Sequence, residues 1–228
     1  MLFRLVKVCT CYILCFYSSI RKNNNIMDTK KILSLGWIIA LLFITGTFVL
    51  GSLLADYSFI SQTVSEIGQE GSPLNSAWQI FSLLVGLLII VFSIGIISFG
   101  RQNKWSIIPG IFILFAGLSE FGIALFPSPH SLHNVFGLSM TIGYFSPLMF
   151  FLLWKDKLGA SFKRYSLFAF VLILLGIFLN LSPAFASQLY PLEYYGLVQR
   201  FLLFIFYIYL AFISFSTSYS FSNIKKAA

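Results

Sequence analysis

Six stretches of this chain are each apolar and close to the length that crosses a lipid bilayer, because about 20 apolar residues in a helix span roughly 30 Å of hydrocarbon. The stretches are Ile32–Leu54, Ala77–Phe99, Trp105–Phe126, Leu132–Trp154, Ser166–Leu181 and Leu197–Ser218. The fifth is the shortest, but the uncharged sequence 165–190 around it allows an extension at either end. Hydrophobic residues make up 58% of the chain and charged residues only 10%. The sequence therefore predicts an all-α polytopic membrane protein, a six-helix transmembrane bundle in one domain over residues 32–218.

The charges between these stretches predict how the bundle is oriented. Segments 55–76, 127–131 and 182–196 contain no Lys or Arg, and they carry Asp56, Glu66, Glu70 and Glu193. The other flanks carry Lys30, Lys31, Arg101, Lys104, Lys155, Lys157, Lys163, Arg164, Lys225 and Lys226. Loops rich in Lys and Arg stay in the cytoplasm. We therefore expect a multi-pass protein of the cell membrane with both ends of the six-span core, including the tail 219–228, in the cytoplasm.

The net charge of +8 follows from the same basic rim. No pattern typical of RNA or DNA binding accompanies the basic residues, and we expect no nucleic-acid partner. Basic residues beside the spans favour anionic lipid headgroups. Membrane lipids are therefore the partners that the charge pattern indicates.

The segment between the first two spans is the most complex part of the sequence. Ile60, Val64 and Ile67 fall at helical spacing, which predicts a short amphipathic helix on the outer surface. Ser72 and Pro73 resemble an N-cap residue followed by a proline in the first turn, and they predict the start of the second span.

Residues 1–31 differ from the rest of the chain. Their uncharged core, Val8–Ile20, is shorter than a spanning helix and is followed by basic residues rather than by a cleavage site. We expect this segment to lie in the membrane interface or to be dispensable, with Met27 as an alternative natural start. All 3 cysteines lie in it at spacings that make no metal site, and no motif for a cofactor appears elsewhere.

Two charged residues, Glu120 and Arg200, lie inside the spans, both toward the outer side. A charge in the hydrocarbon region is expensive and indicates a functional site unless it belongs to a structural ion pair. An Arg200 side chain that snorkels to the interface is the other structural alternative. We predict that Arg200 pairs with at least one glutamate. Glu66 is the expected partner, because Glu66 and Arg200 both lie close to the interface while Glu120 lies deeper.

Other polar residues lie at the same level of the predicted bundle. Together they predict an outward-facing pocket with apolar walls, in which Tyr190, Tyr194 and Tyr195 supply an aromatic rim. The expected ligand is a lipid or another small amphipathic molecule. The candidate ligand-binding residues are Ser65, Glu66, Glu120, His133, Asn134, Gln199 and Arg200.

Two other functions compete with this one. The protein could be an intramembrane hydrolase that uses His133 as general base, with Glu66 or Glu120 as acid or metal ligand. It could also be an accessory subunit that packs on another membrane protein or on a second copy of itself. Small and polar residues recur on one face of several spans, as Asn134, Gly137 and Thr141 do in the fourth. Such stripes are typical of helix–helix contacts, and a polar conduit is the alternative.

Four short motifs occur in order along the outer side: SQTVSEIGQEGSP over Ser61–Pro73, Leu125-Phe126-Pro127, His133-Asn134-x-x-Gly137 and Gly196-x-x-Gln199-Arg200. Together they resemble the domain-of-unknown-function 998 family, small six-span membrane proteins of bacteria and archaea, over residues 32–218. The resemblance implies the topology and the importance of these outer positions, but no activity. Many members place an acidic residue after Phe-Pro, where this chain has Ser128.

Overall fold

A computed structural model describes residues 26–227, and every element in that range is helical. The elements are α2 (Ile26–Leu33), α3 (Leu35–Ser52), η1 (Val64–Gly68), α4 (Asn75–Gln102), α5 (Ile108–Leu125), α6 (Ser131–Tyr144), α7 (Ser146–Trp154), α8 (Gly159–Leu181), η2 (Ser182–Ala184), η3 (Leu192–Tyr194) and α9 (Tyr195–Ala227). Six spans are long and apolar enough to cross a membrane: Thr29–Ser52, Asn75–Gln102, Ile108–Leu125, Ser131–Trp154, Gly159–Ala184 and Leu192–Phe221. The predicted all-α bundle of six spans is confirmed.

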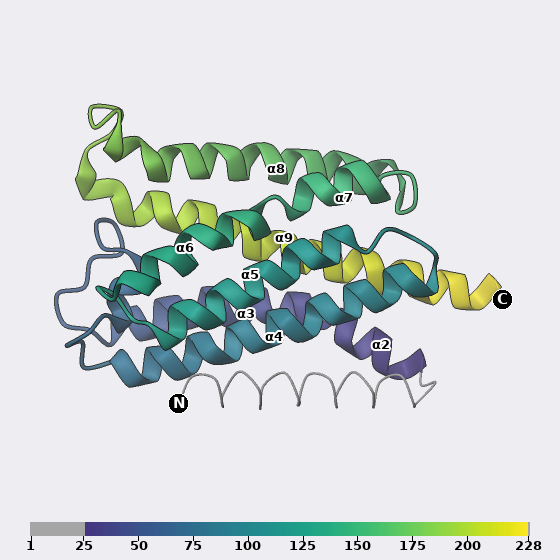
Figure 1. The fold of residues 1–228 in the computed structure, drawn as a ribbon, viewed down its shortest axis with the longest axis horizontal. Helices are drawn as coiled ribbons and strands as arrows, with labels where there is room; N and C mark the ends of the chain where they lie inside the picture. Colours follow the sequence, from purple (N-terminus) through teal and green to yellow (C-terminus); the bar gives the residue numbers. More distant parts are fainter. Residues whose placement is uncertain (1–25, 228) are drawn as a thin grey trace.

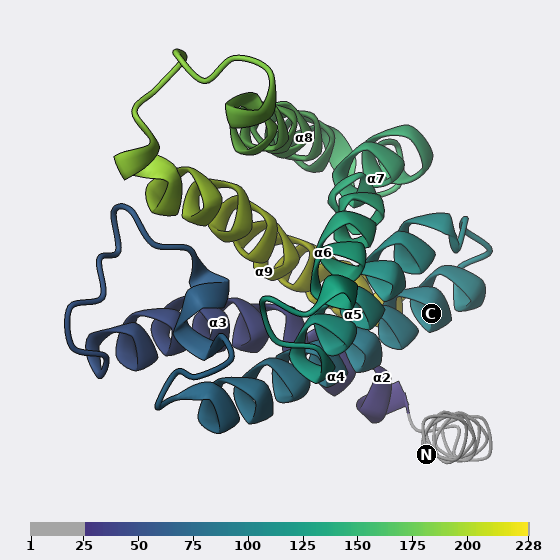
Figure 2. The ribbon, with the colours of Figure 1, turned by 60° about the vertical axis from the view of Figure 1, so that its left-hand side comes forward.

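The helices form a chain of packed neighbours in which α4 packs on α5, α5 on α6, α3 on α9, and α9 on α8 (Figure 1). Turned by 60°, the ribbon shows α9 passing between α8 and α3, so that α9 joins the outermost helix to the rest (Figure 2). Only 22% of the apolar window of α8 is buried, against 56% of that of α4. The helix α8 therefore turns most of its surface toward the membrane.

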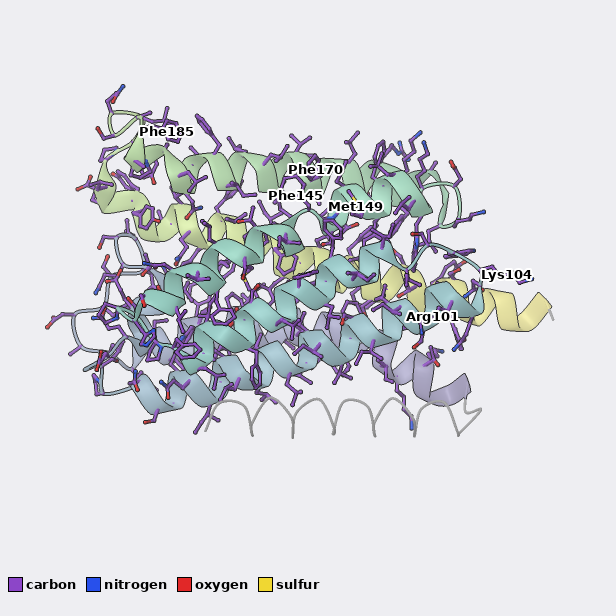
Figure 3. All side chains as sticks on the ribbon, in the orientation of Figure 1. Arg101, Lys104, Phe145, Met149, Phe170 and Phe185 are labelled. Carbon is purple, nitrogen blue, oxygen red and sulfur yellow. The ribbon has the colours of Figure 1, made fainter. Side chains whose placement is uncertain are left out.

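The bundle has two unlike ends (Figure 3). Arg101 and Lys104 mark one end, which we call the basic end. Phe185 marks the opposite end, which we call the loop end and which holds residues 53–74, 126–130 and 182–191. The segments that the sequence analysis assigned to one side of the membrane are thus together at the loop end.

Close helix packing depends on small residues between α4 and α5. A Cβ on Gly86 would lie 2.7 Å from the backbone nitrogen of Phe121, which is far inside van der Waals contact. Only glycine therefore allows the two helices to approach this closely, as is typical of membrane bundles. Farther along α3 and α9, the rings of Phe43 and Tyr207 stack with centroids 3.7 Å apart.

The first span begins earlier than the apolar pattern indicated. Helix α2 already covers residues 26–33, so the predicted boundary between residues 31 and 32 falls inside a helix. Leu33 is fully buried, and the Ser214 hydroxyl of α9 donates a hydrogen bond of 2.6 Å to its carbonyl oxygen. The predictions for the apolar core Val8–Ile20 and for the cysteines concern positions outside the described residues.

The fourth span is broken in the middle, which the sequence analysis did not anticipate. Helix α6 ends at Tyr144 and α7 begins at Ser146, with Pro147 in the first turn of α7. A proline lacks the N–H that would continue the ladder, and its ring clashes with the preceding turn. At the break, Phe145 lies against Phe170 of α8, with ring centroids 5.6 Å apart (Figure 3).

The segment between α3 and α4 holds less helix than predicted. Its only helical part is the 3₁₀ turn η1, in which Val64 and Ile67 are buried, whereas Ile60 is exposed outside it. Ser72 lies in the turn before the next span, where its hydroxyl donates to the carbonyl of Ile67 and accepts from the nitrogen of Leu74. Helix α4 begins only at Asn75.

Candidate functional site

A cavity of about 680 Å³ lies toward the loop end of the bundle, bounded by α3, α4, α5, α6, α8, α9 and η1. Five of the seven candidate ligand-binding residues line it: Ser65, Glu120, His133, Asn134 and Gln199. Side chains from separate parts of the chain are therefore brought to one space. Glu66 and Arg200 do not line the cavity, and they take part in a hydrogen-bond network around residues 57–66.

The guanidinium of Arg200 binds backbone carbonyls rather than a carboxylate. Its Nη1 donates to the carbonyl oxygens of Phe59 at 2.8 Å, Gln62 at 2.7 Å and Gly196 at 3.0 Å. Its Nη2 donates to the phenol oxygen of Tyr57. Within residues 26–227 the guanidinium forms no ion pair with Glu66 or Glu120, so the predicted pairing is wrong.

The physical reason for this correction is the irregular backbone of residues 57–63. Carbonyl groups outside regular helices need donors, and a guanidinium offers several in a fixed fork. The aromatic rings add to the arrangement, since Cζ of Arg200 lies 5.3 Å from the ring centroid of Phe59. Arg200 is only 3% exposed and is held without a counter-charge in direct contact. We call this arrangement the Arg200 clamp.

Tyr57 connects the Arg200 clamp to η1. Its phenol accepts from Arg200 and donates a hydrogen bond of 2.7 Å to the carbonyl oxygen of Thr63. Burial raises the pKa of Tyr57, although the guanidinium of Arg200 acts in the opposite direction. The phenol therefore stays protonated at neutral pH and keeps both hydrogen bonds.

Glu66 stabilises the start of η1. Its Oε1 accepts from the backbone nitrogen of Thr63 at 2.9 Å and from the Thr63 hydroxyl at 2.8 Å, and its Oε2 accepts from Gln62 Nε2 at 3.2 Å. A carboxylate at this position satisfies donors that the turn leaves free. The contacts of Glu66 in the structure are thus those of a capping residue beside the cavity.

The beginning of α9 also holds η1 in place. The side-chain oxygen of Gln199 accepts a hydrogen bond of 2.7 Å from the backbone nitrogen of Val64. Two residues earlier, the Leu197 nitrogen donates to the Ile60 carbonyl at 2.9 Å. Since Gln199 also lines the cavity, η1 forms one wall whose position depends on α9.

Glu120 is the buried acidic residue of the cavity lining. It is 5% exposed, lines the cavity, and lies five residues before the end of α5, about 8 Å along the helix axis. The hydroxyls of Ser82 and Tyr207 lie close enough to interact with its carboxyl group. Neither hydroxyl has a partner in standard hydrogen-bond geometry among the described residues.

His133 stands at the other end of the cavity, where α6 begins. Its Nδ1 lies 2.8 Å from the carbonyl oxygen of Phe126, a hydrogen bond that requires Nδ1 to carry the proton. No carboxylate is bonded to His133 in the part of the chain that the structure describes. In the same part, no three His, Cys, Asp or Glu side chains come together as metal ligands.

A family model matches residues 37–216, and its description reads "Protein of unknown function (DUF998)". The chain belongs to this family. No curated protein and no solved structure matches the chain. The matched DUF998 region contains every residue that lines the cavity and all of the Arg200 clamp.

In this DUF998 protein the polar stripe of α6 lines the cavity, and only its inner end, Tyr144, also packs on Phe206 of α9. Asn134, Thr141 and Tyr144 line the cavity, and a Cβ on Gly137 would meet no atom within 4 Å. The helix-contact reading of this stripe is therefore wrong for the outer half of α6. The spacing was visible in the sequence, but a stripe that faces a cavity has the same spacing as one that faces a helix.

The aromatic wall of the DUF998 cavity was missed from the sequence except for Tyr195. Phe43, Trp78 and Tyr144 line it as well, whereas Tyr190 and Tyr194 do not. Among so many aromatic residues in apolar spans, composition carries no signal that separates Phe43 or Trp78 from ordinary core residues.

The cavity of this DUF998 member is bordered by residues that also face the membrane. Leu138 of α6 is 69% exposed and Leu181 of α8 is 49% exposed, and both line the cavity. Helices α6 and α8 are not close neighbours along their lengths, since α8 packs mainly on α9 and α7. The edge of the cavity between α6 and α8 is therefore apolar and accessible from the side of the bundle.

Proposed function

We propose that this protein binds or moves a lipid or another small amphipathic molecule in the cavity at the loop end. The observation that carries the proposal is a cavity of about 680 Å³ with polar groups on its floor and an apolar, exposed border between α6 and α8. Ligand pockets have volumes of about 300–1,000 Å³ and combine apolar walls with a few convergent polar groups.

The border supports entry from the membrane rather than from water alone. A molecule with an alkyl chain could leave its tail between Leu138 and Leu181 while its head lies inside. The tail then remains in an environment as apolar as the hydrocarbon of the bilayer, which avoids the unfavourable exposure of apolar surface to water.

We further propose that the loop end faces the outside of the cell and that the basic end faces the cytoplasm. Support comes from the charges, since Arg101, Lys104, Lys157 and Arg164 flank the same end of the spans. In that orientation the cavity opens at the level of the outer leaflet.

A fluorescence experiment tests the binding proposal. Trp78 lines the cavity, so a neutral amphiphile with a brominated alkyl chain should quench its fluorescence with saturation in the purified protein. Gly137→Phe should weaken this quenching at least about tenfold, because the new ring enters the open space in front of Gly137.

Val135→Phe is the matched control, since Val135 lies on the same helix, is 58% exposed and does not line the cavity. Quenching that stays unsaturated, or that persists unchanged in Trp78→Phe, would contradict binding in the cavity.

A further inference from the structure

We propose that the cavity selects an amphiphile whose head is an ammonium group, and that Glu120 is the residue that recognises it. This inference rests on the proposed function and names the ligand class for the same cavity. It is carried by the charge of the lining, the unpartnered groups around Glu120 and the aromatic walls.

The charge of the lining has one sign. Glu120 is the only carboxylate among the lining residues, and no Lys or Arg lines the cavity. Arg200 follows Gln199 in sequence but does not line the cavity, and both of its Nη atoms donate to the clamp, while its buried Nε has no partner among the described residues. A negatively charged head would therefore meet no Lys or Arg here, whereas a positively charged head meets the carboxyl group of Glu120 and would stabilise its ionised form.

The carboxyl group of Glu120 has two buried hydroxyls nearby, those of Ser82 and Tyr207, but no cation in the cavity lining. Ser82 is fully buried, lines the cavity, and its hydroxyl has no hydrogen-bond partner among the described residues. The hydroxyl of Tyr207, which is also fully buried, likewise has no hydrogen-bond partner in standard geometry among the described residues. An isolated charge in an apolar site is costly, and a cation placed beside it offsets much of that cost.

The walls near Glu120 have the chemistry that an ammonium group prefers. Tyr144 and Phe43 line the cavity, and Tyr144 lies near enough to interact electrostatically with Glu120. Trp78 lines it as well. The faces of aromatic rings attract cations, and recognition of ammonium ligands by several rings is the best-known use of this attraction.

The same lining argues against a phospholipid head. A phosphate would need a cationic or strongly donating partner, and the lining contains no Lys or Arg, only hydroxyls, side-chain amides such as those of Asn134 and Asn180, and the single imidazole of His133. Moreover, the side-chain nitrogen Nδ2 of Asn180 already donates hydrogen bonds to the carbonyl oxygens of Gly176 and Val198. A single-headed amine or quaternary ammonium on an alkyl chain therefore fits better than a zwitterionic lipid.

The test compares four probes that share one brominated alkyl chain and differ only in the head: trimethylammonium, hydroxyl, sulfate and lysophosphatidylethanolamine. Saturable quenching of Trp78 reports occupation of the cavity for each. We expect the trimethylammonium probe to bind at least about tenfold more tightly than the hydroxyl probe. The sulfate probe should bind most weakly.

Glu120→Gln keeps the size of the side chain and removes its charge. It should lower the affinity for the trimethylammonium probe about tenfold, to that of the hydroxyl probe, and leave the hydroxyl probe unchanged. Glu70→Gln is the matched control, because Glu70 is an exposed glutamate at the loop end that does not line the cavity. It should keep the full preference.

The outcomes separate the two proposals. Equal affinities for the trimethylammonium and hydroxyl probes in the unmodified protein would overturn the ammonium inference and leave binding of amphiphiles in place. A preference that survives Glu120→Gln would overturn the role of Glu120, and tightest binding of the lysophosphatidylethanolamine probe would point to a zwitterionic lipid instead. Absence of saturable quenching by every probe would overturn the proposed function itself.

Discussion

Arg200 shows how a buried charge can be stabilised by neutral acceptors, without a carboxylate. The carbonyl oxygens of Phe59 and Gln62 and the phenol of Tyr57 come from one irregular segment, and all accept from the same guanidinium. The positive charge is thereby spread over several dipoles without an acidic partner. The residue holds the loop between the first two spans against the last span.

Replacing Arg200 with Lys should lower the stability of the protein. An ammonium group reaches fewer of these acceptors because it lacks the planar fork, and each lost hydrogen bond to a charged group is worth roughly 1.5–3 kcal/mol. At about 2–4 °C per kcal/mol for a chain of this size, the melting temperature in detergent should fall by several degrees. Arg164→Lys, at an exposed position, should leave it unchanged.

Exchanging the charges of Glu66 and Arg200 tests whether these two side chains form an ion pair. Each single change, Glu66→Arg or Arg200→Glu, should lower the melting temperature, because each removes separate hydrogen bonds. The double variant should recover nothing, since the two side chains form no ion pair in the described structure. Recovery in the double variant would show that they do pair in the membrane.

At the scale of elements, Gly196 fixes the distance between α9 and the first loop. A Cβ there would lie 2.8 Å from the carbonyl oxygen of Ile60 and 2.9 Å from the nitrogen of Gln62. Gly196→Ala should therefore push the loop away from α9 and lower the melting temperature.

The matched control for this element is Gly137→Ala on α6, where a Cβ meets open space. Alanine favours a helix over glycine by about 1 kcal/mol, so this variant should be as stable as the parent or slightly more so. Both melting temperatures are measured in the same detergent. An equal decrease in the two variants would show that the close contact between Gly196 and the first loop does not cause the loss of stability.

The sequence predicted the spans well and their interruptions poorly. Apolar length alone located all six, because only helices satisfy their backbone hydrogen bonds within a membrane. The break at Phe145 was signalled by Pro147, but a proline inside a long apolar run can equally leave a mild kink. The partners of Arg200 could not be predicted, since backbone carbonyls of an irregular loop leave no pattern of side chains.

The sequence identified most of the polar residues of the site but not the separate role of Glu66. Polar residues at the predicted outer ends identified Ser65, Glu120, His133, Asn134 and Gln199, all of which line the cavity. The separation of Glu66 from that group depends on a turn of 3₁₀ helix that directs its side chain back to Thr63. A one-dimensional pattern cannot distinguish a side chain that lines a cavity from one that caps the wall behind it.

For the whole molecule, the loop end should be accessible from outside the cell. With the cysteines at positions 9, 11 and 15 replaced by serine, Glu70→Cys should react with a membrane-impermeant maleimide in intact cells. Lys157→Cys at the basic end should react only after the membrane is permeabilised. The reverse result would place the cavity on the cytoplasmic side, because the charge rule would then have failed for every loop together.

The Arg200 clamp joins residues that lie more than 130 positions apart, from Tyr57 and Phe59 to the last span. A ribosome completes the first loop long before it makes Arg200, so this loop leaves the translocation machinery without the donor that its carbonyls require. Five spans can be inserted while the wall formed by η1 is still unattached. The cavity is therefore the last part of the protein to acquire its shape, and a nascent chain that stops before α9 should leave residues 57–64 open to an external protease.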